Sequence, residues 1–153
     1  MIQPNPQSTA RVAGHPIHAM LVPIPIVCFV GTLVTDIAYW LTANMQWANF
    51  SAWLLSVGLI VSVLAVLAGL IDIFGDRRIR QIRTAWIHAA GNAVALALSI
   101  VNVFVHSRDA YTSVVPTGLI LSAVVVLILG VTGWLGAGLV HRHGVGVRPG
   151  ERA

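Results

Sequence analysis

The sequence contains few charged residues and a single cysteine, and both shortages restrict what the chain can be. Only 9% of its 153 residues are charged, whereas 57% are hydrophobic, which is far outside the usual composition of a soluble domain. Cys28, the one cysteine, cannot form a disulfide within the chain, and we expect it to fill space inside a helix. The composition predicts an integral membrane protein.

Two kinds of sequence pattern are also missing. No run of about ten residues alternates between polar and apolar side chains, as the strands of a membrane β-barrel do. The sequence has no nucleophile beside a base, no phosphate-binding loop and no metalloprotease helix. These absences argue against a barrel, a hydrolase and a phosphoryl transferase. Whether the chain is an enzyme at all, for example a redox component, stays open.

The chain instead has four long apolar runs separated by short polar connections. Each run reaches the roughly 20 residues that a helix needs to cross the hydrocarbon core of a bilayer. The predicted spans are residues 20–43, 51–73, 85–105 and 114–140. We therefore predict an all-α fold, a transmembrane four-helix bundle over residues 15–140, with a polar N-terminal tail (1–14) and a basic, disordered C-terminal tail (141–153).

The arginines are distributed very unevenly about these spans. Both termini and the loop between the second and third spans share one side, which has eight arginines: Arg11, Arg77, Arg78, Arg80, Arg83, Arg142, Arg148 and Arg152. Arg108 is alone on the other side. The positive-inside rule then predicts cytoplasmic termini, with the basic loop on anionic lipid. Because topology explains the net charge of +4, we expect no nucleic-acid partner.

The stretch GHPIHAMLVPIPI places two histidines, His15 and His18, at the entrance to the first span. Imidazole in such a position can bind a metal, carry protons or anchor a helix at the headgroups. Pro23 and Pro25 lack backbone donors, so we expect the membrane helix to begin properly at Pro25, after a short interfacial segment. This arrangement allows His18 to approach His88 on the third span.

Three ionisable residues are expected at one depth near the cytoplasmic surface. His18 lies at the start of the first span, Asp72 at the end of the second and His88 near the start of the third. With a rise of about 1.5 Å per residue, His88 and Asp72 come to similar depths, about 10 Å from the middle of the bundle. Because such groups are costly at membrane depth, their convergence indicates a functional site.

The third span carries a polar stripe that should face the interior of the bundle. The members of the stripe recur at helical spacing: His88, Asn92, Ser99, Asn102 and His106. His88 and His106 are predicted to lie about 27 Å apart, too far to bind one metal ion. They would therefore belong to separate sites, unless one of them is only an interfacial histidine.

Glycines in the second and fourth spans are predicted to form faces on which helices approach closely, since apolar side chains gain nothing over lipid. An alternative role is to leave room for a flat ligand between helices. The glycines concerned are Gly58, Gly69, Gly130, Gly133, Gly136 and Gly138.

The stretch GHPIHAMLVPIPI with its spanning helix, followed by AWIHAAGN at the third span, resembles the small bacterial membrane proteins grouped as domain of unknown function 2231. The resemblance extends from Gly14 to about Leu139. It departs at Ala19, where members often have a second proline. The resemblance implies a four-helix membrane domain that has been associated with the two-haem cytochrome b type of bundle, without an established activity.

Residues and resemblance together lead to one hypothesis, a b-type haem with His18 and His88 as axial ligands in an electron-transfer protein that serves a redox partner protein. Low-spin haem needs two nitrogen ligands from opposite sides, which facing helices supply. His15, Asp72 or Asn92 would orient a ligand or bind a propionate.

Some residues remain as secondary candidates for this or a second site. His141 could approach the cytoplasmic layer as a spare ligand. A second haem is disfavoured, because His106 has no evident histidine partner at the outer side, and Asp36 is a poor axial ligand.

Three other functions remain open. A zinc, copper or iron site would use the mixed ligand set His15, His18, His88 and Asp72. A proton-linked protein would use Asp36 with His106 and Asn102 in the outer half. A structural membrane subunit would use the histidines only as interfacial polar groups, without a cofactor. The sequence also leaves open whether the bundle works alone or as a homo-oligomer.

Overall fold

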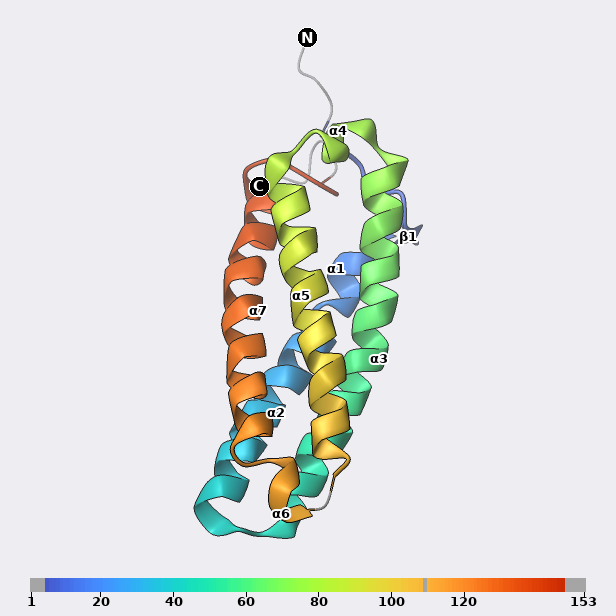
Figure 1. The fold of residues 1–153 in the computed structure, drawn as a ribbon. Helices are drawn as coiled ribbons and strands as arrows, with labels where there is room; N and C mark the ends of the chain where they lie inside the picture. The colour runs from blue at the N-terminus through green and yellow to red at the C-terminus, as the bar shows by residue number, and fades with distance from the viewer. Residues whose placement is uncertain (1–4, 109, 148–153) are drawn as a thin grey trace.

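The computed structural model describes residues 5–108 and 110–147. Within these residues four long helices form a bundle: α2 Pro23–Thr42, α3 Met45–Gly75, α5 Arg83–His106 and α7 Thr117–His141 (Figure 1). Each of them, α2 taken together with the short helix α1 before it (Ile17–Leu21), is long and apolar enough to cross a membrane. The predicted all-α, four-helix membrane fold is confirmed.

The first span is broken near its start by its prolines. Helix α1 ends at Leu21, and α2 begins at Pro23, two residues before the expected start at Pro25. A proline is tolerated in the first turn of a helix, where its missing amide has no partner to lose. The break turns α1 against α3, as Figure 1 shows, and this carries His18 toward the centre of the bundle.

Two other helix starts differ from the predicted boundaries by three residues or more. Helix α3 begins at Met45 rather than near residue 51, because the side chain of Asn44 accepts a hydrogen bond from the Gln46 amide at 3.0 Å and caps the helix. Helix α7 begins at Thr117 rather than at residue 114, directly after Pro116. A side-chain cap sets the start of α3, and the start of α7 follows a proline, whereas hydropathy reports the membrane core and not the helix terminus.

The polar segment before the first span folds back over one end of the bundle. Two short strands, β1 Arg11–Val12 and β2 His15–Pro16, pair antiparallel within it. The amide of Gly146 donates to the carbonyl oxygen of Pro6 at 2.9 Å, and the Gln7 side chain donates to the carbonyl oxygen of Val147 at 3.2 Å. Residues 1–14 and 141–153 were predicted as tails, yet hydrogen bonds join their described parts, 5–14 and 141–147, whereas residues 1–4 and 148–153 lie outside the described part.

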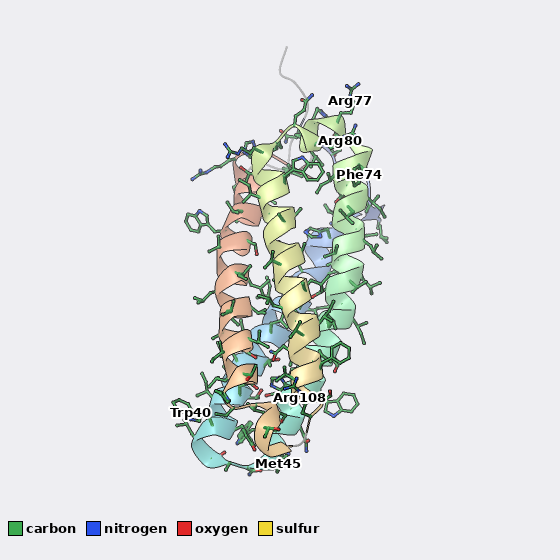
Figure 2. All side chains as sticks on the ribbon, in the orientation of Figure 1. Trp40, Met45, Phe74, Arg77, Arg80 and Arg108 are labelled. Carbon is green, nitrogen blue, oxygen red and sulfur yellow. The ribbon has the colours of Figure 1, made fainter. Side chains whose placement is uncertain are left out.

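The loop between α3 and α5 contains helix α4 (Arg77–Arg80). Asp76 caps α4 by accepting from the Arg78 amide at 2.9 Å, and the Arg78 guanidinium lowers the pKa of Asp76 to about 2. Ile79 is buried against the bundle, while Arg77 and Arg80 point outward (Figure 2). The basic loop therefore has an apolar side that packs on the bundle and a basic side that faces outward.

The two ends of the bundle differ in charge. The arginines of α4, the N-terminal segment and the C-terminal end of α7 lie at one end, whereas α6 (Ala110–Ser113) and the turn between α2 and α3 lie at the other (Figure 1). Arg108 is at the α6 end, near Met45 (Figure 2). The fold thus gathers the basic residues at one end, as four spans require.

The surface of the bundle is apolar and part of its interior is polar. Large hydrophobic side chains face outward, among them Trp134, which is 76% exposed, and Leu127, which is 71% exposed. A small core of Phe29, Leu55 and Val125 lies inside, next to polar side chains that are fully buried: Thr32, Asp36, Ser51, Ser99 and Asn102. This distribution suits a lipid environment, because polar groups avoid lipid by facing one another.

Candidate functional site

His18 and His88 come together in the half of the bundle nearest α4. Their ring centroids are 6.1 Å apart, and the ring planes are nearly perpendicular, at 83°. His18 reaches this position because α1 is turned inward by the proline break, and His88 lies little more than one turn from the start of α5. Residues distant in sequence thus form a pair of facing imidazoles.

One ring nitrogen of each histidine is engaged by a helix backbone. Nδ1 of His18 lies 2.7 Å from the carbonyl oxygen of Ala65 on α3, and Nδ1 of His88 lies 2.8 Å from the carbonyl oxygen of Thr132 on α7. A carbonyl oxygen only accepts, so each Nδ1 must carry the hydrogen. The Nε2 lone pair of each neutral ring is then available as a ligand.

Two glycines make room for these rings. A Cβ atom on Gly69 would lie 3.0 Å from Nδ1 of His18, and one on Gly136 would lie 3.0 Å from Cε1 of His88. By contrast, a Cβ on Gly130, Gly133 or Gly138 would meet open space. The glycines at 69 and 136 therefore leave space for the imidazoles against the helix backbone. The predicted close helix approach occurs at Gly58, where a Cβ would lie 2.9 Å from the Cβ of Cys28 on α2, and it is absent at the other three positions.

A cavity of about 440 Å³ surrounds the pair, within the range usual for small-molecule and cofactor sites. Its wall includes both imidazoles and mostly apolar neighbours: His18, His88, Phe29, Ile73, Leu96 and Leu129. Toward the α4 end, Ser8 and Gly146 of the two terminal segments also line it, together with His141. The terminal segments thus contribute to the wall of the cavity that contains the histidines.

Asn92 lies one turn after His88 and contacts it. Its side-chain nitrogen donates to the backbone carbonyl oxygen of His88 at 2.8 Å and lies 3.3 Å from His88 Nε2. The Thr132 hydroxyl donates to the Asn92 side-chain oxygen at 3.4 Å. Asn92 therefore holds a fixed place beside the available nitrogen of His88.

Asp72 was predicted at the same layer, and it lines the same cavity, but it bonds elsewhere. Its Oδ1 accepts from the Ser8 hydroxyl at 2.8 Å and from the amides of Thr9 and Ala10 at 2.7 and 2.8 Å. This carboxylate anchors the N-terminal segment to α3. The sequence could not show this, because no local pattern links residues so far apart in the chain.

His15 and His141 are exposed and remain outside the pair. His15 belongs to strand β2, where it is opposite Val12. Among the residues that the structure describes, no group of three or more histidine, cysteine or acidic side chains is placed to hold a metal ion. The mixed four-ligand metal site is therefore not assembled.

Loss of the Asp72 anchor should free the N-terminal segment. We expect Asp72→Ala to raise the exchange rates of the Thr9 and Ala10 amide hydrogens at least about tenfold, because charge-assisted hydrogen bonds contribute about 1.5–3 kcal/mol each. Hydrogen exchange measured by NMR checks this. Asp76→Ala is the matched control, since it removes the bond to the Gln7 amide and leaves Thr9 and Ala10 bonded. Unchanged exchange in Asp72→Ala would show that other contacts hold the segment.

A second polar group lies near the α6 end of the bundle and is called here the polar ring, formed by Asp36, Asn102, His106 and Ser122. His106 Nε2 lies 2.9 Å from Asp36 Oδ1, and the Ser122 hydroxyl donates to Asp36 Oδ2 at 2.6 Å. Asn102 donates to the Ser122 oxygen at 2.9 Å, and its own side-chain oxygen lies 3.1 Å from His106 Nδ1. The structure thus gathers three residues that the sequence grouped, and adds Ser122, whose only signal was a hydroxyl on an apolar helix.

Similarity to known proteins extends over both of these sites. Residues 14–149 match a family described as predicted membrane protein (DUF2231). No curated protein and no solved structure gives a match. The matched stretch includes all four long helices and both members of the histidine pair. Because it takes in most of the chain, this protein belongs to the DUF2231 family of predicted membrane proteins.

Proposed function

We propose that this integral membrane protein binds one b-type haem through His18 and His88 and transfers electrons within the membrane. The observation that carries the proposal is the pairing of two imidazoles whose Nδ1 atoms both bond to helix carbonyls. A histidine that binds a metal commonly donates its other ring nitrogen to such an acceptor, which fixes its tautomer and orientation. Both His18 and His88 have such a hydrogen bond from Nδ1 to a backbone carbonyl oxygen.

The spacing of the pair supports a shared ligand. Two imidazoles that bind one metal ion from opposite sides, each through a nitrogen at about 2.0 Å, have ring centroids roughly 6 Å apart. The centroids of His18 and His88 are 6.1 Å apart. The apolar cavity around them, with glycines behind both rings, fits a flat and largely apolar group.

His18 and His88 would hold the iron as axial ligands, and Asn92 would restrict rotation of the His88 ring. Two protein nitrogen ligands would leave no place on the group for a substrate, which favours electron transfer over catalysis. When bound, haem supplies reversible one-electron chemistry. Arg83, at the start of α5 and at the same end of the bundle, would offset propionate charge.

The proposed surroundings are the bacterial inner membrane, with both termini and α4 cytoplasmic. The excess of arginine at that end supports this orientation. The histidine pair would then lie in the cytoplasmic half of the bilayer. A redox partner protein would exchange electrons with it from that side.

The visible absorption spectrum tests the proposal directly. Wild-type protein, purified from cells supplied with ample haem, is expected to show a Soret band of six-coordinate low-spin haem. His18→Ala and His88→Ala should each lower the haem bound per chain at least about tenfold, because even changes to residues behind a ligand cost about 10–100-fold in metal affinity.

His15→Ala is the matched control, since His15 is exposed and only three residues from His18; its spectrum should equal that of the wild type. A colourless wild-type protein contradicts haem binding, and metal analysis of that sample then identifies any zinc, copper or iron. A Soret band that survives both ligand substitutions contradicts the assignment of His18 and His88.

A further inference from the structure

The polar ring at the α6 end takes no part in the proposed haem site, because His106 is the last residue of α5 and His88 lies close to its start. The ring joins three helices, with Asp36 on α2, Asn102 and His106 on α5, and Ser122 on α7. It is withdrawn from solvent, since the side chains of His106 and Asp36 are 1% and 0% exposed. Asp36 and His106 are thus an acid and an imidazole in direct contact inside the bundle.

The hydrogen bonds of the ring determine where its hydrogens must be. Asn102 donates to the Ser122 oxygen, so the Ser122 hydroxyl hydrogen is directed to Asp36 Oδ2. His106 Nδ1 faces the backbone and side-chain oxygens of Asn102, at 3.0 and 3.1 Å. Both of these oxygens are acceptors, so Nδ1 carries a hydrogen. Only the 2.9 Å contact between His106 Nε2 and Asp36 Oδ1 can vary in its proton content.

The contact between Asp36 Oδ1 and His106 Nε2 forms a good hydrogen bond only when a single proton lies in it. With none, the Nε2 lone pair would face an ionised oxygen, and a carboxylate would be buried with a net negative charge. With two, an O–H and an N–H would point at each other. With one, every donor in the ring has an acceptor, whether the proton is on the carboxyl group or on the imidazole, and the pair is neutral overall.

No other described side chain at this end supplies a buried positive charge that would balance an ionised Asp36. Among the side chains that the structure describes at this end, the other titratable or charged groups on the surrounding helices are Tyr39 on α2 and Arg108 after α5. Arg108 is exposed, and a phenol in its usual form has no charge. Helices α3 and α7 bring none to this end.

We propose that Asp36 and His106 form a binding site for a single proton, held between Asp36 Oδ1 and His106 Nε2, which gives the bundle a proton-linked function separate from the histidine pair. Ionisable residues inside membrane spans serve proton relays when they pair with one another in the interior. Ser122 and Asn102 are positioning residues here, since they hold the carboxylate and the imidazole in register.

Nuclear magnetic resonance of ¹⁵N-histidine-labelled protein in lipid bilayers tests the site. At a pH of about 7, free imidazole is mostly neutral and has one bare nitrogen. His106, assigned through the backbone, is expected to show a hydrogen on Nδ1 and a proton carried or shared at Nε2. Asp36→Asn should release one proton per chain and leave Nε2 of His106 without it.

Thr35→Ala is the matched control, because it removes a hydroxyl next to Asp36 on α2 that bonds to Ser51 and leaves all four members of the polar ring in place, so the shared proton should remain. A bare Nε2 on wild-type His106 at neutral pH overturns the proposal. That measurement needs no variant, so it decides the question even if Asp36→Asn fails to fold. The measurement can also be made on haem-free protein, so the proposed proton site and the proposed haem site can be contradicted independently.

Discussion

Replacing Asp36 by alanine is expected to lower the free energy of unfolding by about 3–5 kcal/mol, because removing one partner of a buried ionisable pair leaves the other uncompensated. In Asp36→Ala the His106 Nε2 and the Ser122 hydroxyl would both lose their acceptor. Neither can turn to water, since the polar ring lies inside the bundle. Unfolding of the reconstituted protein by steric trapping in bicelles measures this change.

The double variant sharpens this prediction. Asp36→Ala combined with His106→Ala should destabilise less than the sum of the single changes, because the second substitution removes the group that the first leaves unpaired. Thr35→Ala is the matched control on α2; it removes a hydroxyl that bonds to Ser51 at 2.7 Å and should cost about 0.5–1.5 kcal/mol. Additive single effects, or a loss in Asp36→Ala no larger than in Thr35→Ala, would contradict the pairing.

Gly136→Val is expected to weaken haem binding strongly while both ligands remain. Its Cβ would lie 3.0 Å from Cε1 and 3.3 Å from Nδ1 of His88, and its γ-methyl groups would enter the space of the ring. Overpacking of this kind costs about 1–3 kcal/mol, so haem content should fall by roughly tenfold or more. The ratio of Soret absorbance to protein measures it.

Gly138→Val provides the comparison, since a Cβ there meets nothing within 4 Å and the helix propensity change is identical. Its haem content should equal that of the wild type. Gly69→Val should behave as Gly136→Val does, because its Cβ would press on Nδ1 of His18. Equal haem content in Gly136→Val and Gly138→Val would mean that haem binding does not need the space that Gly136 leaves for the His88 ring.

Much of the fold could be predicted from hydropathy, because the bilayer requires spans of a minimum length and the backbone must satisfy its own hydrogen bonds. The helix ends could not be predicted in the same way. Met45 begins α3 because of the Asn44 cap, and the break before Pro23 depends on where a proline is tolerated. Such ends depend on single side chains that hydropathy averages away.

The two sites were predictable to different degrees. Depth and helical spacing place His18 near His88, because both quantities follow from counting residues along a helix. The partners behind the rings, the carbonyl groups of Ala65 and Thr132, have no sequence signature, since every residue has a carbonyl. Depth alone did not predict the partners of Asp72. It lies at the expected level, but its Oδ1 accepts hydrogen bonds from the amides of Thr9 and Ala10.

The hydrogen bonds between the two terminal segments have a consequence for biosynthesis. Gly146 and Val147 are made after α7, so their bonds to Pro6 and Gln7 cannot form until the last span has left the ribosome. Until then the half of the bundle that contains the histidine pair lacks part of its wall. The wall of the cavity at this end is therefore completed only after all four spans have been made.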